Sequence, residues 1–158
     1  HAQENRLSPE LKKSYLMGKD FIIRAAEKMP DAEYGFKPTP QVRTFGELVA
    51  HVAEAHAFIC GLGVAPKQDQ TKRTSKADLV KYLRDSYVLC DIAVNSLTDA
   101  KATQTFKMMG QEQTILSGLW GNVVHDNETY GTMAVYLRLK GQVPPSSEGP
   151  PSGDGKKK

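Results

Sequence analysis

The sequence predicts an all-α protein in which four helices pack as a bundle. Four segments carry apolar residues that recur at alternating spacings of three and four, as on one face of a helix. Stretches containing proline or glycine separate these segments, and each segment is long enough to bury one face against its neighbours. The chain has 158 residues, of which 39% are hydrophobic and 25% charged, as in one domain with its own core.

The first two helices have recognisable start signals. Ser8–Pro9 places an N-cap residue before a proline at the first helical position, and Pro30 ends the helix. The second helix begins at Thr44, with Glu47 at the spacing of a capping box. Its apolar stripe is Leu48, Val52, Ala55, Ile59 and Leu62.

The third helix begins near Thr74–Ser75, where Asp78 in the first turn suits the positive helix end. The polar stretch after it, residues 99–113, is ambiguous and includes an expected extended piece at 105–109. The fourth helix runs from about Thr114 to Lys140, and Gly141 ends it.

The fourth helix is poor in charge. Asp126 and Glu128 are its only formal charges between residues 114 and 137, so we expect it to lie centrally and to be covered on more than one side. Its three glycines are expected to let a neighbouring backbone approach closely. These glycines are Gly118, Gly121 and Gly131.

Residues 1–147 are expected to form one domain. The chain from Pro144 onward is rich in proline, glycine and serine and is predicted to be extended or disordered, with 148–158 as a disordered tail. The net charge of +3 comes largely from three terminal lysines, so the rest is nearly neutral and shows no basic stripe for nucleic acid. No segment has the ~18 consecutive apolar residues of a membrane span.

The compartment has two interpretations. Ala2 before Gln3 resembles the product of signal peptidase, which favours export to the periplasm or beyond; a truncated cytoplasmic protein with a tag scar fits as well. Cys60 and Cys90 fit small apolar core positions. Two cysteines are too few for a disulfide framework, but a single bridge remains open.

The best candidates for a chemical role are two histidines on different helices. His51 lies at the edge of the second helix's apolar stripe, beside Glu47 and Glu54. His125 lies on the fourth helix, opposite its apolar stripe. Imidazoles and carboxylates from facing helices are the usual first-row metal ligands of bundles. The polar or small residues on the His125 face are Gly118, Gly121, Thr129, Thr132 and Tyr136.

Two motifs strengthen this hypothesis. The run HDNETYG at 125–131, which continues to YLRLKG and VPP, resembles the last helix of the DinB-like family, and TFGELVAH at 44–51 resembles its second helix. The likeness spans roughly residues 10–147. It implies an up-down-down-up bundle with a long crossover between helices 2 and 3.

The resemblance also implies a metal site. Family members hold a divalent ion, commonly nickel or zinc, with one histidine from helix 2 and an H-x-x-x-H pair from helix 4. His51 and His125 match the first two ligands, but Thr129 stands where the third histidine is expected. A threonine hydroxyl is a poor ligand for such metals. Three outcomes stay open: Glu128 or another carboxylate completes the site, the ion binds weakly with water, or the site is lost.

Two functions follow from these alternatives. The first is a metal-dependent enzyme acting on a small molecule by hydrolytic or thiol-transfer chemistry, with Glu128 as substitute ligand or base and Tyr136 as proton donor. The second is a non-catalytic bundle that has lost its metal and serves as a binding or dimerisation module, which Thr129 favours. Homodimerisation is an expectation in either case. His56 is interpreted as a rim or core histidine.

Overall fold

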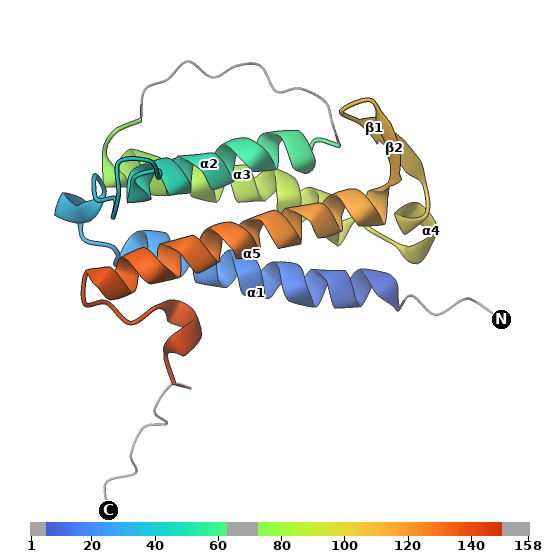
Figure 1. The fold of residues 1–158 in the computed structure, drawn as a ribbon. Coiled ribbons are helices and arrows are strands. Elements are labelled where there is room, and N and C mark those ends of the chain that lie inside the picture. Colours follow the sequence, from blue (N-terminus) through green and yellow to red (C-terminus); the bar gives the residue numbers. More distant parts are fainter. Residues whose placement is uncertain (1–5, 63–72, 150–158) are drawn as a thin grey trace, which may run out of the picture.

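The computed structural model describes residues 6–62 and 73–149, and these residues are mostly helical (Figure 1). The predicted all-α fold is confirmed. The four long helices are α1 (Leu7–Lys28), α2 (Phe45–Ile59), α3 (Lys76–Asn95) and α5 (Ile115–Leu139). The shorter elements are η1 (Asp31–Glu33), α4 (Asp99–Ala102), β1 (Thr105–Met108), β2 (Gln111–Thr114) and η2 (Pro145–Ser147).

Helices α2 and α3 run in the same direction. His56 contacts Ser86 and Cys60 bonds Cys90, so the paired residue numbers increase together along the two helices. Helix α2 therefore ends at the opposite end of the molecule from the start of α3, as the predicted crossover requires (Figure 1). Helices α1 and α5 lie side by side and run the other way, joined by the stacked rings of Phe21 and Tyr130.

The start signals of α2 and α3 act as the sequence predicts. The Thr44 hydroxyl accepts from the backbone N–H of Glu47, whose carboxylate accepts from the N–H of Thr44, forming a complete capping box. Ser75 caps α3 by accepting from the N–H of Asp78. At the end of α5, Gly141 has a φ of 69°, the left-handed conformation that favours glycine after a helix.

The start of α1 differs from the prediction. Ser8 lies inside the helix rather than capping it. The cap is supplied by Asp99 of α4, whose carboxylate accepts from the backbone N–H groups of Arg6, Leu7 and Ser8. A residue about 90 positions away satisfies these N–H groups, which local sequence signals cannot reveal.

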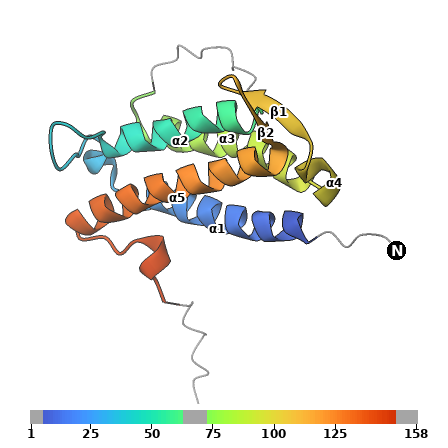
Figure 2. The ribbon, with the colours of Figure 1, turned by 45° about the vertical axis from the view of Figure 1, so that its right-hand side comes forward.

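The polar stretch after α3 forms a short antiparallel hairpin, in which β1 pairs with β2. Its extended part was predicted, and Figure 2 shows the hairpin beside α4 at the end of the molecule where α5 begins. Phe106 of β1 packs on Gly118 of α5: a Cβ there would lie 2.7 Å from the ring. Gly118 thus permits the close approach of a side chain rather than of a backbone, and Gly121 and Gly131 meet nothing within 4 Å, so the predicted backbone approach is not found at these glycines.

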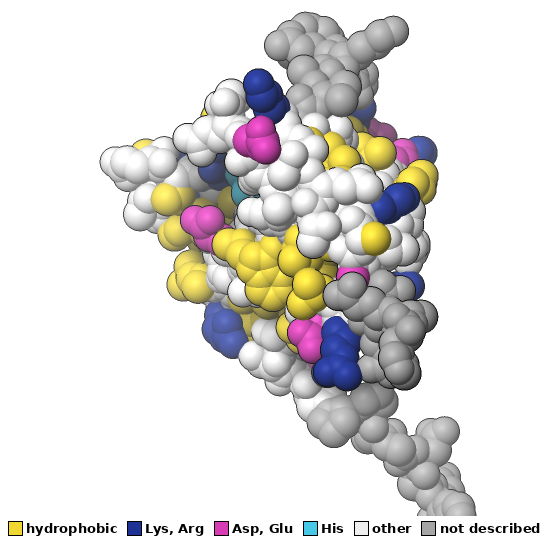
Figure 3. All heavy atoms as spheres, turned by 90° about the vertical axis from the view of Figure 1, so that its right-hand side faces the viewer, with side chains coloured by type: hydrophobic (Ala, Val, Ile, Leu, Met, Phe, Trp, Pro, Cys, Tyr) yellow, Lys and Arg dark blue, Asp and Glu magenta, His cyan; other side chains and the backbone are white. Residues whose placement is uncertain are grey.

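Helix α5 packs against α1 and α2, but it is not central. Trp120 is 48% exposed and Val124 is 53% exposed, so one side of the helix faces solvent despite its low charge. Figure 3, which views the hairpin end of the molecule, shows a hydrophobic patch at the centre of this face and smaller hydrophobic groups around it. The predicted cover on more than one side is found, since α5 packs against both α1 and α2, but the predicted central position is wrong.

The segment after α5 is ordered as far as Glu148, which corrects the prediction of an extended or disordered chain from Pro144. Ser146 exchanges hydrogen bonds with the Tyr130 hydroxyl of α5, and Pro145 is buried. The Glu148 carboxylate forms ion pairs with Arg24 and Lys28 of α1. This segment therefore ties the ends of α1 and α5 together.

Some predictions fall on residues outside the described ranges. These are the signal-peptidase junction at the N-terminus, the loop at 63–72 and the tail from residue 150 onward. Among the described residues, no helix combines the length and apolar character needed to cross a membrane.

Candidate metal site between α2 and α5

His51 and His125 meet across the interface between α2 and α5. Their Nε2 atoms are 3.0 Å apart, and the ring planes are tilted by 57°. Imidazole nitrogens bind zinc at about 2.0–2.1 Å, so two such ligands at right-angled or tetrahedral positions lie about 2.9–3.4 Å from each other. The separation of the two nitrogens therefore fits two ligands of one ion.

His51 is held in the form that can bind a metal. Partial burial lowers the pKa of its imidazole below the ordinary value, and Arg43 and His125 lower it further. The carboxylates of Glu54 and Glu128 act in the opposite direction but do not reverse the shift. A lowered pKa keeps the imidazole neutral, with a lone pair available, over a wider pH range.

His125 is followed by a buried carboxylate. The Nδ1 atom of His125 is buried and, among the described residues, has no hydrogen-bond partner. Asp126 Oδ1 lies 3.6 Å from it, close enough for an ion pair but longer than a hydrogen bond. The ring of His125 thus faces His51 with one nitrogen and a carboxylate with the other.

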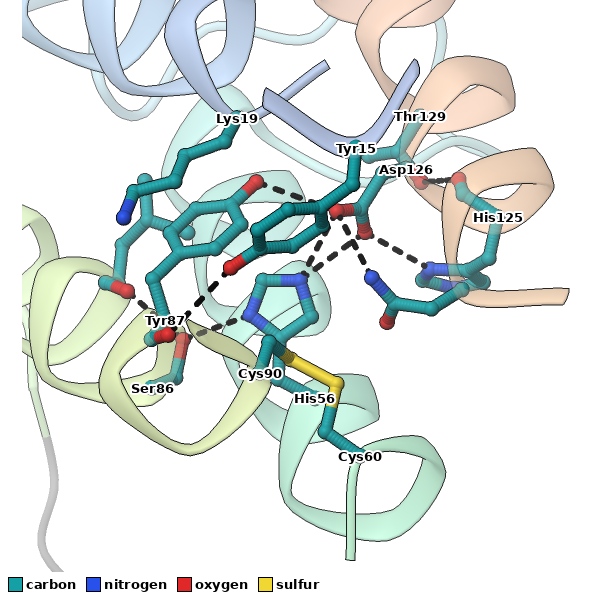
Figure 4. A network of polar contacts seen from close by, with 12 residues as sticks. Tyr15, Lys19, His56, Cys60, Ser86, Tyr87, Cys90, His125, Asp126 and Thr129 are labelled. Carbon is teal, nitrogen blue, oxygen red and sulfur yellow. Dashed lines mark hydrogen bonds and ion pairs between the residues drawn. A yellow bond between two sulfur atoms is a disulfide. The ribbon is translucent and has the colours of Figure 1, made fainter. Parts of the chain in front are cut away.

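Asp126 receives three donors, from three helices (Figure 4). His56 Nε2 of α2 lies 3.0 Å and 3.1 Å from its two oxygens, and Tyr87 of α3 donates its hydroxyl at 3.2 Å. Asn122 of α5 donates its amide at 3.3 Å. Although burial alone would raise the pKa of the Asp126 carboxyl, the rings of His125 and His56 bring it below its usual range.

The network continues on either side of Asp126. The Nδ1 atom of His56 lies 2.8 Å from the Ser86 hydroxyl. Farther from His125, Tyr15 of α1 donates its hydroxyl to Asp91 at 2.7 Å, and Lys19 pairs with the same carboxylate. Polar groups from all four long helices therefore meet in one part of the core (Figure 4).

A disulfide bond joins Cys60 and Cys90, whose Cα atoms are 5.0 Å apart. Each cysteine lies one helical turn beyond a member of the network, since His56 precedes Cys60 by four residues and Ser86 precedes Cys90 by four. The bond links the end of α2 to α3 and holds the His56–Ser86 contact between them (Figure 4). The bridge that the sequence left open is therefore present.

The other residues predicted for the site are Thr129, Glu128 and Tyr136, and none of them contacts the imidazole ring of His51 or His125 through a described hydrogen bond. Thr129 is buried, and its hydroxyl donates to the His125 carbonyl at 3.0 Å, so it acts within its own helix. Glu128 is exposed. Tyr136 donates its hydroxyl to the Arg43 carbonyl at 2.8 Å, and burial raises the pKa of that phenol, which holds it protonated.

An open cavity of about 640 Å³ lies beside His51. Lys37 and Arg43 bring positive charge to its wall, and Glu47 and Glu54 bring negative charge. Because Glu47 is engaged in the capping box, Glu54 is the carboxylate of this wall that no described hydrogen bond engages. The cavity is large enough for a small molecule next to the histidine pair.

These residues fit a metal ion only in part. The two histidines have the separation of two ligands, but Thr129 does not replace the third. Within the described ranges, no group of three or more His, Cys, Asp or Glu side chains is arranged to hold a metal ion. A third protein ligand would require Glu54 or Glu128 to change its side-chain conformation.

Comparison with known proteins agrees with this fold. The profile of the DinB superfamily matches residues 22–133. The chain belongs to the DinB superfamily. Among solved structures, it is similar to a DinB-like protein from Bacillus cereus, with 20% identity, a TM-score of 0.73, and coverage of 85% of this chain and 93% of the other.

A DinB-like protein from Bacillus subtilis is similar to the same degree, with 18% identity, a TM-score of 0.72, and coverage of 85% and 94%. No curated protein matches the chain. Identities this low establish the DinB-like fold and nothing about the chemistry of the histidine pair.

Sequence reasoning missed the role of Asp126. The signal was its position: Asp126 lies on the buried stripe of α5 between Leu119 and Tyr130, where an apolar residue is expected. His56 likewise follows Val52 by four residues on the buried stripe of α2. An acid and a histidine at buried positions of facing helices are a signal for a buried pair.

Proposed function

We propose that this DinB-superfamily protein is a metal-dependent enzyme acting on a small molecule, with a divalent ion such as nickel or zinc held by His51 and His125. The observation that carries the proposal is the 3.0 Å separation of the two Nε2 atoms. The lowered pKa of His51 supports it, because a metal ligand must be unprotonated.

The absence of a third histidine makes this an open site. Glu54 and Glu128 both act electrostatically on His51, and both are exposed and free of the capping interactions that engage Glu47. Either carboxylate would complete a two-histidine, one-carboxylate set, which suits a divalent first-row metal and leaves positions for water or substrate.

A bound divalent ion supplies Lewis acidity, which lowers the pKa of a bound water or thiol and favours hydrolytic or thiol-transfer chemistry. The chain's own contribution is the cavity beside His51. Its walls of Lys37, Arg43 and Glu54 would orient a small polar molecule, and Tyr136 fixes the loop that carries Arg43 through its hydrogen bond to the Arg43 carbonyl.

Metal content tests this proposal. Protein stripped with a chelator and then dialysed against zinc or nickel should retain close to one ion per chain, as measured by inductively coupled plasma mass spectrometry. His51→Ala and His125→Ala should each abolish retention, whereas the control Lys37→Ala, on the cavity wall, should not. Equal retention in all four proteins, or none in the wild type, would show that the pair holds no ion.

A second candidate function has two observations in its favour. The Thr129 hydroxyl donates to its own helix, and the exposed Trp120 and Val124 of α5 offer an apolar surface. These features fit a metal-free DinB-type bundle that binds a partner or a second copy of itself. Sedimentation of the metal-free protein distinguishes the two: a stable dimer without metal retention supports the second candidate.

We also propose that the protein works in an oxidising compartment, outside the cytoplasm. The Cys60–Cys90 disulfide supports this, because such bonds persist where thiols are not kept reduced. Protein alkylated at the moment of cell lysis, without reductant, should show both cysteines unmodified by a maleimide reagent. Full modification of both thiols would contradict the proposal.

A further inference from the structure

Hydrogen placement in the histidine pair limits which tautomers can bind an ion. Two Nε2 atoms 3.0 Å apart share one hydrogen when no metal is present. When both bind one ion, both must present lone pairs, so His125 must carry its hydrogen on Nδ1. The metal-ready form of His125 therefore needs an acceptor next to Nδ1.

A carboxylate of the same helix lies near this nitrogen. Asp126 Oδ1 is 3.6 Å away, and His125 Nδ1 is buried without a hydrogen bond. A small rotation of the ring closes the remaining gap, because 3.6 Å exceeds a normal hydrogen bond by only a few tenths of an ångström.

Asp126 is itself held in place. His56, Tyr87 and Asn122 donate to the carboxylate from α2, α3 and α5, which stabilises its charged form and leaves it little freedom to turn. The disulfide one turn beyond His56 and Ser86 fixes the two helices that supply the first two donors. The carboxylate is thus buried and oriented before any ion binds.

We infer that Asp126 is a positioning residue: it accepts the Nδ1 hydrogen of His125, so that Nε2 of His125 and Nε2 of His51 both face one ion. This inference rests on the proposed function only for its metal; the tautomer it requires is a property of the metal-free protein. With this tautomer, His51 would donate its Nε2 hydrogen to the bare Nε2 of His125 across the 3.0 Å contact.

Replacing Asp126 with asparagine should reverse the tautomer. An amide oxygen at the position of Oδ2 would accept from His56, Tyr87 and Asn122, which leaves the amide NH₂ at the position of Oδ1, facing His125. Because an NH₂ group can only donate, His125 would become an acceptor at Nδ1 and carry its hydrogen on Nε2. It would then block the position of the ion.

The test is long-range ¹H–¹⁵N correlation spectroscopy of the imidazoles in metal-free, full-length protein in mildly alkaline buffer. We expect His125 to be protonated at Nδ1 in the wild type and at Nε2 in Asp126→Asn. Competition with a chromogenic chelator should show zinc binding weakened by about 10–100-fold in that variant. The control Asp91→Asn removes a carboxylate of the same network that does not contact His125, and should change neither property.

Wild-type His125 protonated at Nε2 would overturn the inference, and this result does not depend on the folding of any variant. An Asp126→Asn protein that folds with an unchanged tautomer would also overturn it. If the tautomer depends on Asp126 as expected but zinc does not bind the wild type, the positioning role stands and the proposed metal function fails.

Discussion

Thr129 determines how many side chains can bind an ion at the His51–His125 pair. Its hydroxyl donates to the His125 carbonyl one turn earlier, so the position faces the same interface but contributes no strong ligand. The side chain at position 129 therefore decides whether the site between α2 and α5 has two histidines or three.

Thr129→His should add the missing ligand and tighten zinc binding by about tenfold or more, because three protein ligands hold an open zinc site better than two. Isothermal titration of metal-free protein measures the change. Asn127→His, which adds a histidine at an exposed position of the same helix, is the control. If both variants bind zinc equally, position 129 does not face the pair.

Asp99 provides a pH-dependent contribution to stability. Its hydrogen bonds from the N–H groups of Arg6 and Ser8 help to lower the pKa of the carboxyl from 3.8 to about 2. A lowered folded-state pKa means that the stabilisation is present above about pH 4 and is lost as the pH falls toward 2, because the unfolded chain then binds more protons.

Thermal unfolding followed by circular dichroism between about pH 2 and pH 5 tests this effect. The midpoint of the wild type should fall more steeply with decreasing pH than that of Asp99→Asn, which lacks the titrating group. Parallel curves for the two proteins would mean that Asp99 does not hold the start of α1 in solution.

Much of the histidine pair was predictable at the residue scale, but its surroundings were not. Helical spacing placed His51 at the edge of one apolar stripe and His125 opposite another, and the resemblance to the DinB-like family paired the two. The charge pattern of the helix singles out Asp126 and Glu128 alike, and only the position of Asp126 on the buried stripe indicates a paired charge. The partners of a buried charge come from other helices, so sequence spacing alone could not name Tyr87 or Asn122.

At the scale of elements, the two glycines near the start of α5 differ in their surroundings. A Cβ at Gly118 would lie 2.7 Å from the Phe106 ring of β1, whereas a Cβ at Gly121 would meet nothing within 4 Å. The first glycine permits contact between hairpin and helix; the second only lowers the helix propensity.

Gly121→Ala should raise the free energy of unfolding by about 0.5–1 kcal/mol, because alanine favours the helix. Gly118→Ala gains the same propensity but forces the Phe106 ring to move, so it should be the less stable of the two variants. Urea denaturation of the folded variants measures the difference. A Gly118→Ala protein as stable as Gly121→Ala would mean that the hairpin does not pack on α5 as described.

The disulfide is the covalent link between α2 and α3. It closes a loop with a sequence separation of 30 residues, for which chain entropy alone predicts a stabilisation of about 3–4 kcal/mol. Denaturation with and without a reductant should show a loss of this size, and Cys60→Ala/Cys90→Ala should match the reduced wild type. No difference between oxidised and reduced protein would indicate that the bond is absent in solution.

Helix starts with local signals were predictable, and those with distant partners were not. Thr44 and Ser75 cap their helices through residues three positions away, so their sequences suffice. The start of α1 depends on Asp99, and the ordered segment at 145–148 depends on Arg24, Lys28 and Tyr130. The segment is rich in proline and serine, which suggests disorder. The contacts that order it are made with other elements, so its own composition does not reveal them.

At the scale of the whole molecule, the DinB-like fold brings the two histidines together. Parallel α2 and α3 are joined by the disulfide, α5 lies against α2, and the pair forms at that second interface. The polar network around Asp126 contacts all four long helices, so the position of His125 depends on the packing of the whole bundle.

The central claim is that one divalent ion is held by two histidines, and X-ray absorption spectroscopy at the zinc edge tests it most directly. On zinc-loaded, oxidised protein, we predict two imidazole ligands, with oxygen atoms of carboxylate or water in the remaining positions. His125→Ala should reduce the imidazole count to one. A spectrum without imidazole ligands in the wild type, or one unchanged by His125→Ala, would contradict the account.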